Sequence, residues 1–308
     1  MDEIVGVNRT SVPKIGFGTY QMEGKECLQA VRTALETGYR HVDTAMAYDN
    51  ESVIGDAIAE SEVDREDVFL TTKVKGYREM LTYDRFLAEA EGSLDRLGTD
   101  YVDLLLVHWW QRDGDMEGVF RALDELVAEG KVRHIGVSNF SVELLERARD
   151  VAETPILTNQ IEYHPYFTDI HGDTVNYCQE HDILVTAYSP LAEGRVVSDE
   201  TFAEIGERHG KTAAQVTIRW LIQQDGVIAI PKSSTDRYIR ENLDVFDFEL
   251  SDAEMQTITD ARGSFRYRFL DKQGGPIHTM RGVVGSRMPE PMRKAALSIG
   301  SAALKSIR

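Results

Sequence analysis

Short apolar runs alternate with amphipathic segments along most of the chain. Each run has the length and the β-branched and large apolar residues of a buried strand. Eight such runs predict strands: "KIGFGT" (14–19), "YRHVD" (39–43), "VFLTTK" (68–73), "YVDLLLV" (101–107), "RHIGV" (133–137), "ILTNQ" (156–160), "ILVTA" (183–187) and "VIAI" (227–230).

Several intervening segments carry an apolar stripe that ends at a glycine, which is a common residue just past a helix end. We therefore predict helices there. The stripes are Cys27, Ala30, Val31, Ala34 and Leu35 before Gly38, then Phe86, Leu87, Ala90, Leu94 and Leu97 before Gly98, and Val119, Phe120, Leu123, Leu126 and Val127 before Gly130.

Eight strands separated by helices predict an α/β fold, a closed parallel (β/α)8 barrel. A doubly wound open sheet is the alternative, but its nucleotide loop would follow the first strand, and "GFGTYQ" is not GxGxxG. "GERHGKT" (206–212) superficially resembles a phosphate-binding loop, yet it has three residues between its glycines and no preceding strand. We predict a helix that ends at Gly210 and another capped by Thr212, with Gln215 completing a capping box.

Composition narrows the class of protein. The 308 residues are 42% hydrophobic, enough for a large core, and no apolar run approaches the roughly 18 residues of a membrane span. The start "MDEIVGVNRT" lacks the basic and apolar regions of a signal peptide. Cys27 and Cys178 form no CxxC pair, so we expect a reduced cytoplasmic protein without structural zinc or another metal site.

The net charge of −18 divides unevenly, with about −25 on residues 1–262 and about +7 on residues 263–308. An acidic body argues against nucleic-acid binding, which needs a basic footprint. It fits either adaptation to a salt-rich cytoplasm or an ordinary acidic protein.

We expect residues 1–262 to form the barrel domain and residues 263–308 a basic, helical C-terminal extension. Its end, "PEPMRKAALSIGSAALKSIR", carries a weak apolar stripe of Met292, Ala296, Ile299, Ala303 and Ile307. We favour a helix packed on the acidic barrel. Contact of residues 286–308 with an anionic membrane or an acidic partner is the alternative.

Four titratable residues fall at or just after predicted strand ends: Asp43, Tyr48, Lys73 and His108. In a barrel, these ends line one rim, where active sites form. An ammonium beside a phenol should lower its pKa, and a carboxylate should keep the ammonium charged. A histidine across the site can donate a hydrogen bond to a carbonyl oxygen, so the group predicts protonation of a carbonyl without a metal.

Eight motifs extend the pattern: "GFGTYQM", "HVDTAMAYDNE", "LTTKV", "LLLVHW", "IGVSNF", "NQIEYHPY", "AYSPL" and "IPKSS…RENL". In this order they resemble the aldo-keto reductase superfamily, from about residue 5 to about residue 262, and most closely its prokaryotic 2,5-diketogluconate reductase-like and aldehyde reductase branch. The resemblance implies a TIM barrel with an N-terminal β-hairpin cap that binds a nicotinamide dinucleotide and reduces aldehydes or ketones.

The resemblance also implies roles for residues. Tyr48 would be the general acid, Asp43 and Lys73 would tune it, and His108 would orient the carbonyl. The cofactor contacts it implies are Ser138, Asn139 and Gln160 at the carboxamide, Tyr188 against the nicotinamide ring, Ser189 and Leu191 at the pyrophosphate, Lys232 and Ser233 at the 2′-phosphate, and Glu241 and Asn242 near the adenine.

One position departs from the family pattern. NADP-dependent relatives usually carry an arginine six residues after the "PKS" lysine, and here that residue is Tyr238, preceded by Arg237. Tyrosine lacks the charge that grips a phosphate. We expect NADP(H), held with the help of Lys232 and Ser233, while Arg237 reaching in or use of NAD(H) stay open.

The substrate is less defined. Tyr20, Trp109 and Trp110 are expected to line an open pocket for small carbonyls or keto-sugars. We expect a monomeric enzyme. A cofactor-binding regulatory or redox-sensor subunit with little turnover is the alternative. A barrel isomerase or aldolase is a weaker one, because no phosphate-binding rim or second strand-end lysine is evident.

Overall fold

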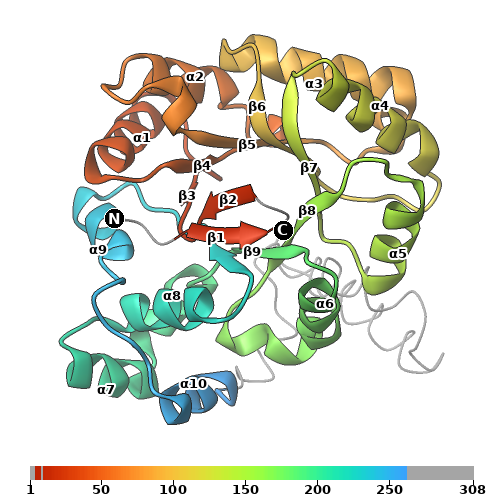
Figure 1. The fold of residues 1–308 in the computed structure, drawn as a ribbon. Helices are drawn as coiled ribbons and strands as arrows, with labels where there is room; N and C mark the ends of the chain where they lie inside the picture. The colour runs from red at the N-terminus through yellow and green to blue at the C-terminus, as the bar shows by residue number, and fades with distance from the viewer. Residues whose placement is uncertain (1–3, 8–9, 262–308) are drawn as a thin grey trace, which may run out of the picture.

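The computed structural model describes residues 4–7 and 10–261, and the extension expected at 263–308 lies outside them. In this part of the chain, parallel strands surround a central axis and helices cover their outer face (Figure 1). The strands are β3 (Phe17–Gly18), β4 (His41–Asp43), β5 (Phe69–Val74), β6 (Val102–Val107), β7 (Val132–Ser138), β8 (Ile156–Glu162), β9 (Leu184–Tyr188) and β10 (Val227–Ala229).

These strands pair in chain order from β3 to β10, all in parallel. The sheet closes on itself, because Ile15 bridges Ala229 in parallel and Gly16 N donates to Ala229 O at 2.9 Å. Glycine is needed at this seam: a Cβ on Gly18 would lie 2.8 Å from the carbonyl oxygen of Ile230. The predicted barrel is confirmed, and closure excludes the doubly wound alternative.

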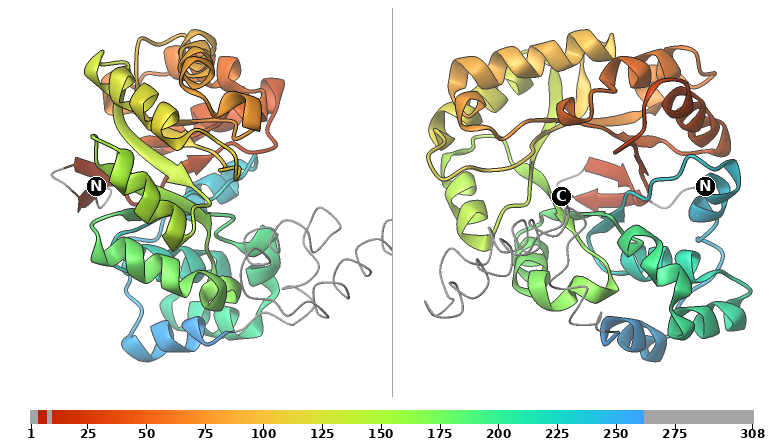
Figure 2. Two further views of the ribbon diagram at one scale, coloured as in Figure 1. Left: turned by 90° about the vertical axis from the view of Figure 1, so that its right-hand side faces the viewer. Right: turned by 180° about the vertical axis from the view of Figure 1, so that it is seen from behind.

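The helices form the outer ring, which Figure 2 shows from the side and from behind. They are α1 (Gly24–Thr37), α2 (Glu51–Ala59), α3 (Tyr83–Leu97), α4 (Met116–Ala128), α5 (Val142–Val151), α6 (Thr168–Glu180), α7 (Glu200–His209), α8 (Ala213–Gln223), α9 (Asp236–Leu243) and α10 (Asp252–Thr259). Short 3-10 turns occur at η1 (Met46–Tyr48), η2 (Arg65–Asp67), η3 (Arg78–Met80), η4 (Pro165–Phe167) and η5 (Ala192–Ser198).

Local sequence signals account for several helix ends. Gly38, Gly98 and Gly210 adopt left-handed backbone conformations directly after α1, α3 and α7, as the predicted stops require. Thr212 and Gln215 form the predicted capping box of α8. The segment that resembles a phosphate loop is therefore a helix boundary.

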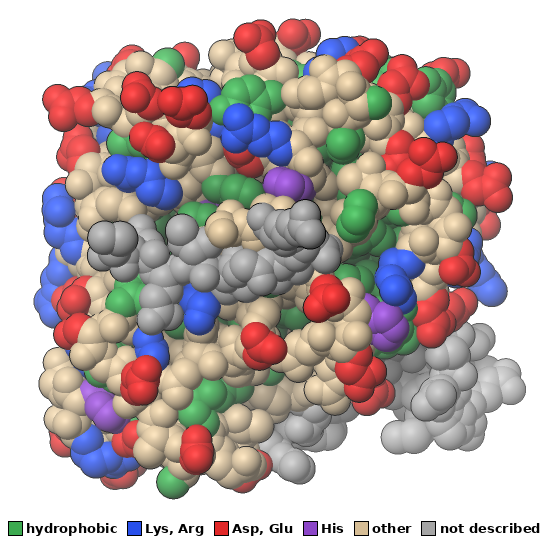
Figure 3. Space-filling model, in the orientation of Figure 1, with side chains coloured by type: hydrophobic (Ala, Val, Ile, Leu, Met, Phe, Trp, Pro, Cys, Tyr) green, Lys and Arg blue, Asp and Glu red, His purple; other side chains and the backbone are tan. Residues whose placement is uncertain are grey.

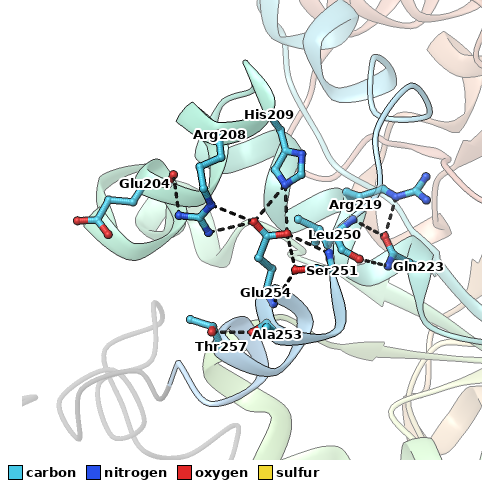
Figure 4. Close-up of polar contacts among 10 residues, drawn as sticks. All are labelled: Glu204, Arg208, His209, Arg219, Gln223, Leu250, Ser251, Ala253, Glu254 and Thr257. Atoms are coloured by element: carbon cyan, nitrogen blue, oxygen red, sulfur yellow. Dashed lines mark hydrogen bonds and ion pairs between the residues drawn. The ribbon is translucent and has the colours of Figure 1, made fainter.

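A carboxylate holds α10, the last helix of the described residues, in place (Figure 4). Glu254 of α10 accepts hydrogen bonds from Arg208 and His209 of α7 and from the backbone and hydroxyl of Ser251. Burial opposes ionisation, but the bonds from Ser251, His209 and Arg208 lower the pKa of Glu254 to about 2. The contact fixes α10 on the outside of the ring.

A β-hairpin crosses the end of the barrel that faces the viewer in Figure 1. Its antiparallel strands are β1 (Ile4–Val7) and β2 (Thr10–Pro13). Val12 of β2 packs into the barrel interior against Leu104, Leu157 and Ile228. The predicted N-terminal cap is thus present, and it closes the end opposite the strand carboxyl termini.

The surface charge and the character of the helices complete the description of the fold. On the hairpin face, acidic and basic side chains are interspersed (Figure 3). None of the described helices combines the length and apolar character needed to cross a membrane.

Candidate active site

The four residues that the sequence singles out lie together at the carboxyl end of the barrel. Asp43 is the last residue of β4, Lys73 is next to last in β5, and His108 directly follows β6. Tyr48 ends the 3-10 turn η1, which follows β4. Period-two alternation explains the inward direction of His108, because Leu104 and Leu106 of the same strand pack inside the barrel.

Lys73 is the centre of the group. Its side chain is fully buried, and Nζ donates to Asp43 Oδ1 at 2.6 Å, to Thr44 O at 2.7 Å and to the Tyr48 hydroxyl at 3.3 Å. The second Asp43 oxygen accepts from Gln160 Nε2 at 2.7 Å. Both charges of the buried pair therefore have hydrogen-bond partners, as a buried ion pair requires.

The predicted direction of the Tyr48 pKa is wrong. Burial raises the pKa of Tyr48 well above its ordinary value, and the charge of Asp43 adds to the effect. The Lys73 ammonium loses its proton more readily than an ordinary lysine, because burial lowers the pKa of Lys73 although Asp43 opposes this. Tyr48 consequently keeps its proton at neutral pH and releases it only to a strong base, such as an alkoxide.

His108 faces Tyr48 edge-on, with the ring centroids 5.8 Å apart. Burial, then the charges of Lys73 and Lys75, lower the pKa of His108 to about 3. The imidazole is therefore neutral at physiological pH and has one N–H to donate.

We expect the His108 ring to stay unprotonated when the pH falls from 8 to 5. In the unfolded chain a histidine has a pKa of about 6.5. Between that pH and about 3, the unfolded chain takes up a proton that the folded His108 does not. The contribution of His108 to stability is therefore fully present above the unfolded pKa and is lost as the pH falls toward about 3. Imidazole nitrogen NMR, assigned with His108→Asn, measures the midpoint. A midpoint between 6 and 7 would contradict this environment.

The residues predicted to hold a nicotinamide carboxamide form a connected set at the ends of β7 and β8. Ser138 Oγ donates to Gln160 O at 2.9 Å, and Asn139 Nδ2 donates to Ser138 Oγ at 2.9 Å. Tyr188, at the end of β9, donates to Asn139 Oδ1 at 3.0 Å. Since Gln160 also contacts Asp43, the structure joins this amide-rich set to the catalytic group. Its donors and acceptors fit an amide ligand beside an aromatic ring.

The other predicted cofactor residues lie further out, on the β9 and β10 side of the rim. Ser189 has a left-handed backbone (φ 48°), Leu191 packs against the core, and Asn242 is buried. Lys232 is exposed, and Ser233 Oγ accepts from Thr235 N at 3.1 Å.

Tyr238, which departs from the family pattern, and its neighbour Arg237 lie on helix α9. Arg237 pairs with Glu241 of the same helix at 2.6 Å, and Tyr238 is 52% exposed. Arg237 would have to leave Glu241 in order to reach a phosphate.

Two of the three predicted substrate-wall aromatics border the catalytic group. The Tyr20 ring lies 5.0 Å from that of Tyr48, and the Trp109 ring lies 6.4 Å from His108. Both are substantially exposed. Trp110 is partly buried and packs edge-on against Phe140.

A family model described as "Aldo/keto reductase family" matches residues 14–262. The chain belongs to this family. It is 42% identical over 252 residues to the glyoxal reductase of Bacillus subtilis (strain 168), covering 82% of this chain and 89% of that protein.

Solved structures agree with this assignment. A putative 2,5-diketo-D-gluconic acid reductase B superposes with a TM-score of 0.83 at 43% identity, over 89% of this chain and 96% of the other. A mutant of Gox0644 in complex with NADPH superposes with a TM-score of 0.77 at 35% identity, covering 86% of this chain and 95% of the other. This aldo/keto reductase is therefore an oxidoreductase on a (β/α)8 barrel.

Sequence reasoning missed one buried polar residue of this aldo/keto reductase, Asn50. Its amide donates to Thr19 O at 3.0 Å and Met22 O at 3.1 Å, and it accepts from Thr44 Oγ1 at 2.7 Å. These bonds tie the turn that carries Tyr48 to the loop that carries Tyr20. The position of Asn50 between Tyr48 and α2 is a local signal, but its distant partners are visible only in the fold.

No group of three or more His, Cys, Asp or Glu side chains in the described chain is arranged to hold a metal ion. Cys27 and Cys178 are buried, and burial raises the pKa of both thiols, to about 11 and about 12. Both are therefore protonated and unreactive at neutral pH.

Proposed function

We propose that this protein is an NADP(H)-dependent reductase that converts small aldehydes, ketones or keto-sugars to alcohols, with Tyr48 as the general acid. The observation that carries the proposal is the buried Asp43–Lys73–Tyr48 chain of hydrogen bonds, facing His108 at the barrel mouth. The glyoxal reductase name of a relative supports a small carbonyl substrate.

Each member of the group has a distinct task. The neutral His108 donates its N–H to the carbonyl oxygen and orients it toward Tyr48. As negative charge develops on that oxygen, Tyr48 transfers its phenolic proton to it. Lys73, 3.3 Å away, stabilises the phenolate that remains, and Asp43 keeps Lys73 charged and in place. Solvent then returns a proton to Tyr48.

The bound cofactor would supply a hydride to the carbonyl carbon. We propose that Ser138, Asn139 and Gln160 hold its carboxamide and that Tyr188 covers its ring. Further contacts are proposed for Ser189, Leu191, Lys232, Ser233, Glu241 and Asn242. The NADPH complex of a structural relative supports this choice of cofactor.

We expect Tyr238→Arg to increase the preference for NADPH over NADH about three- to tenfold, because it adds a charge-assisted contact to the 2′-phosphate. Quenching of tryptophan fluorescence gives both dissociation constants without turnover. Tyr238→Gln is the matched control without a charge, and molar salt should shrink the gain. An unchanged ratio of dissociation constants would place the phosphate elsewhere.

Cofactor oxidation with a panel of small aldehydes and keto-sugars tests the proposed function. NADPH and NADH are compared at low and at molar salt. Turnover that requires Tyr48 supports a reductase. Tight cofactor binding without turnover under every condition would instead favour the regulatory or sensor role.

We also propose that residues 1–262 form the catalytic domain, since the family model ends at residue 262. Residues 263–308 would then be an accessory extension, and contact of residues 286–308 with a membrane or partner stays a secondary hypothesis.

A further inference from the structure

Lys75 continues the inward-facing row of β5. Phe69 packs in the barrel interior and Lys73 bonds to the catalytic residues, whereas Thr72 bonds to Glu51 of α2 and Val74 packs in the outer core. Successive side chains of a strand point to opposite faces. Lys75, directly after the strand, therefore points over the barrel mouth, one step beyond Lys73.

The backbone around Lys75 is fixed against the segment that carries His108. His108 N donates to Val74 O at 3.0 Å. A Cβ on Gly76 would lie 1.7 Å from Trp109 O, so the two segments are in direct backbone contact. The charge of Lys75 also contributes to the lowered pKa of His108.

The ammonium of Lys75 has no partner among the described residues. No hydrogen bond or ion pair to it occurs there, although the side chain is only partly exposed. Other partly buried lysines are paired: Lys131 contacts Glu91 and Lys211 contacts Asp244. Withdrawing an unpaired charge from water is unfavourable, so a ligand that brings an anion here would relieve that cost.

We propose that Lys75 binds a carboxylate carried by the carbonyl substrate, which makes this enzyme selective for anionic aldehydes and keto acids. The inference rests on the proposed carbonyl reduction and specifies its substrate class. The cofactor's phosphates are a poor alternative source of the anion. Their proposed contacts follow β9 and β10, and β5 lies four strands from β9 and three from β10 in the closed eight-stranded ring.

A matched pair of substrates, one with and one without a carboxylate, isolates the effect of the substrate's charge. Succinic semialdehyde carries a carboxylate, and its methyl ester has a similar shape without the charge. We expect wild-type kcat/KM to favour the acid about tenfold, the size of one charge-assisted contact at a partly buried site. Lys75→Met should remove most of this preference through KM. Lys75→Arg should keep it, and rising salt should weaken it in the wild type.

Lys25→Met is the matched control, because Lys25 is an exposed lysine at the start of α1, and the same charge change there should leave the acid-to-ester ratio unaltered. A ratio that does not respond to Lys75→Met, or that shows no salt dependence in the wild type, overturns this proposal alone, provided that turnover depends on Tyr48. Turnover that is independent of Tyr48 overturns the proposed function, and this inference with it.

Discussion

Replacing Tyr48 with phenylalanine should lower kcat for carbonyl reduction about 10²–10⁴-fold, the usual contribution of a positioned general acid. The change removes the only acidic proton of that side chain and keeps its ring beside Tyr20 and His108. Steady-state kinetics with NADPH and a small aldehyde measure the loss. Cofactor binding, followed by fluorescence quenching, should change little, because Gln160 bonds to Asp43 and Tyr188 to Asn139, and neither bond involves the phenol.

Tyr77→Phe is the matched control for this experiment. Tyr77, after β5, is exposed, unlike the largely buried Tyr48, and has no place in the proposed mechanism. Its variant should retain wild-type kcat. If Tyr48→Phe retained more than half of the wild-type kcat with the fold intact, the assignment of Tyr48 as the acid would be wrong.

Lys73→Met should lower the free energy of unfolding by about 3 kcal/mol, the lower end of the cost of breaking a buried ion pair. The substitution leaves the buried Asp43 carboxylate with Gln160 as its remaining side-chain partner and removes three donated hydrogen bonds. Urea denaturation at pH 7 measures the change. Carbonyl reduction should fall as well, because Tyr48 loses the cation that stabilises its phenolate.

The double variant Asp43→Asn with Lys73→Met separates stability from activity. It removes both charges, so much of the lost stability should return while activity stays low. A double-mutant cycle with no coupling between the two positions would mean that the 2.6 Å contact contributes nothing to the fold.

The sequence predicts the fold well because its strands are buried on both sides and read as apolar runs. Each of the eight predicted runs overlaps a strand, with ends displaced by up to a few residues. The first shows the greatest difference: only Phe17–Gly18 remains a strand of the predicted 14–19 segment, with Ile15 as an isolated bridge. That seam depends on contacts with Ile230 and Ala229, more than 200 residues away, which no local pattern contains.

The candidate site is likewise predictable from the sequence only in part. Asp43, Lys73 and His108 are predictable because each lies at or directly after the carboxyl end of a strand of a recognisable barrel. The Tyr48 pKa is not, because its direction depends on burial, and burial is a property of the closed fold. Asn50 and Lys75 were missed for related reasons: one has partners across the rim, and the other gains its direction only from the alternation of β5.

The most direct test of carbonyl reduction measures its products. The purified chain is incubated with NADPH and glyoxal, and NADP⁺ and the alcohol are quantified together over time, with Tyr48→Phe in parallel. The account predicts equal amounts of the two products from the wild type and at least about a hundredfold slower formation from the variant. Cofactor that binds tightly while no alcohol forms, or alcohol that forms equally fast in both proteins, would contradict it.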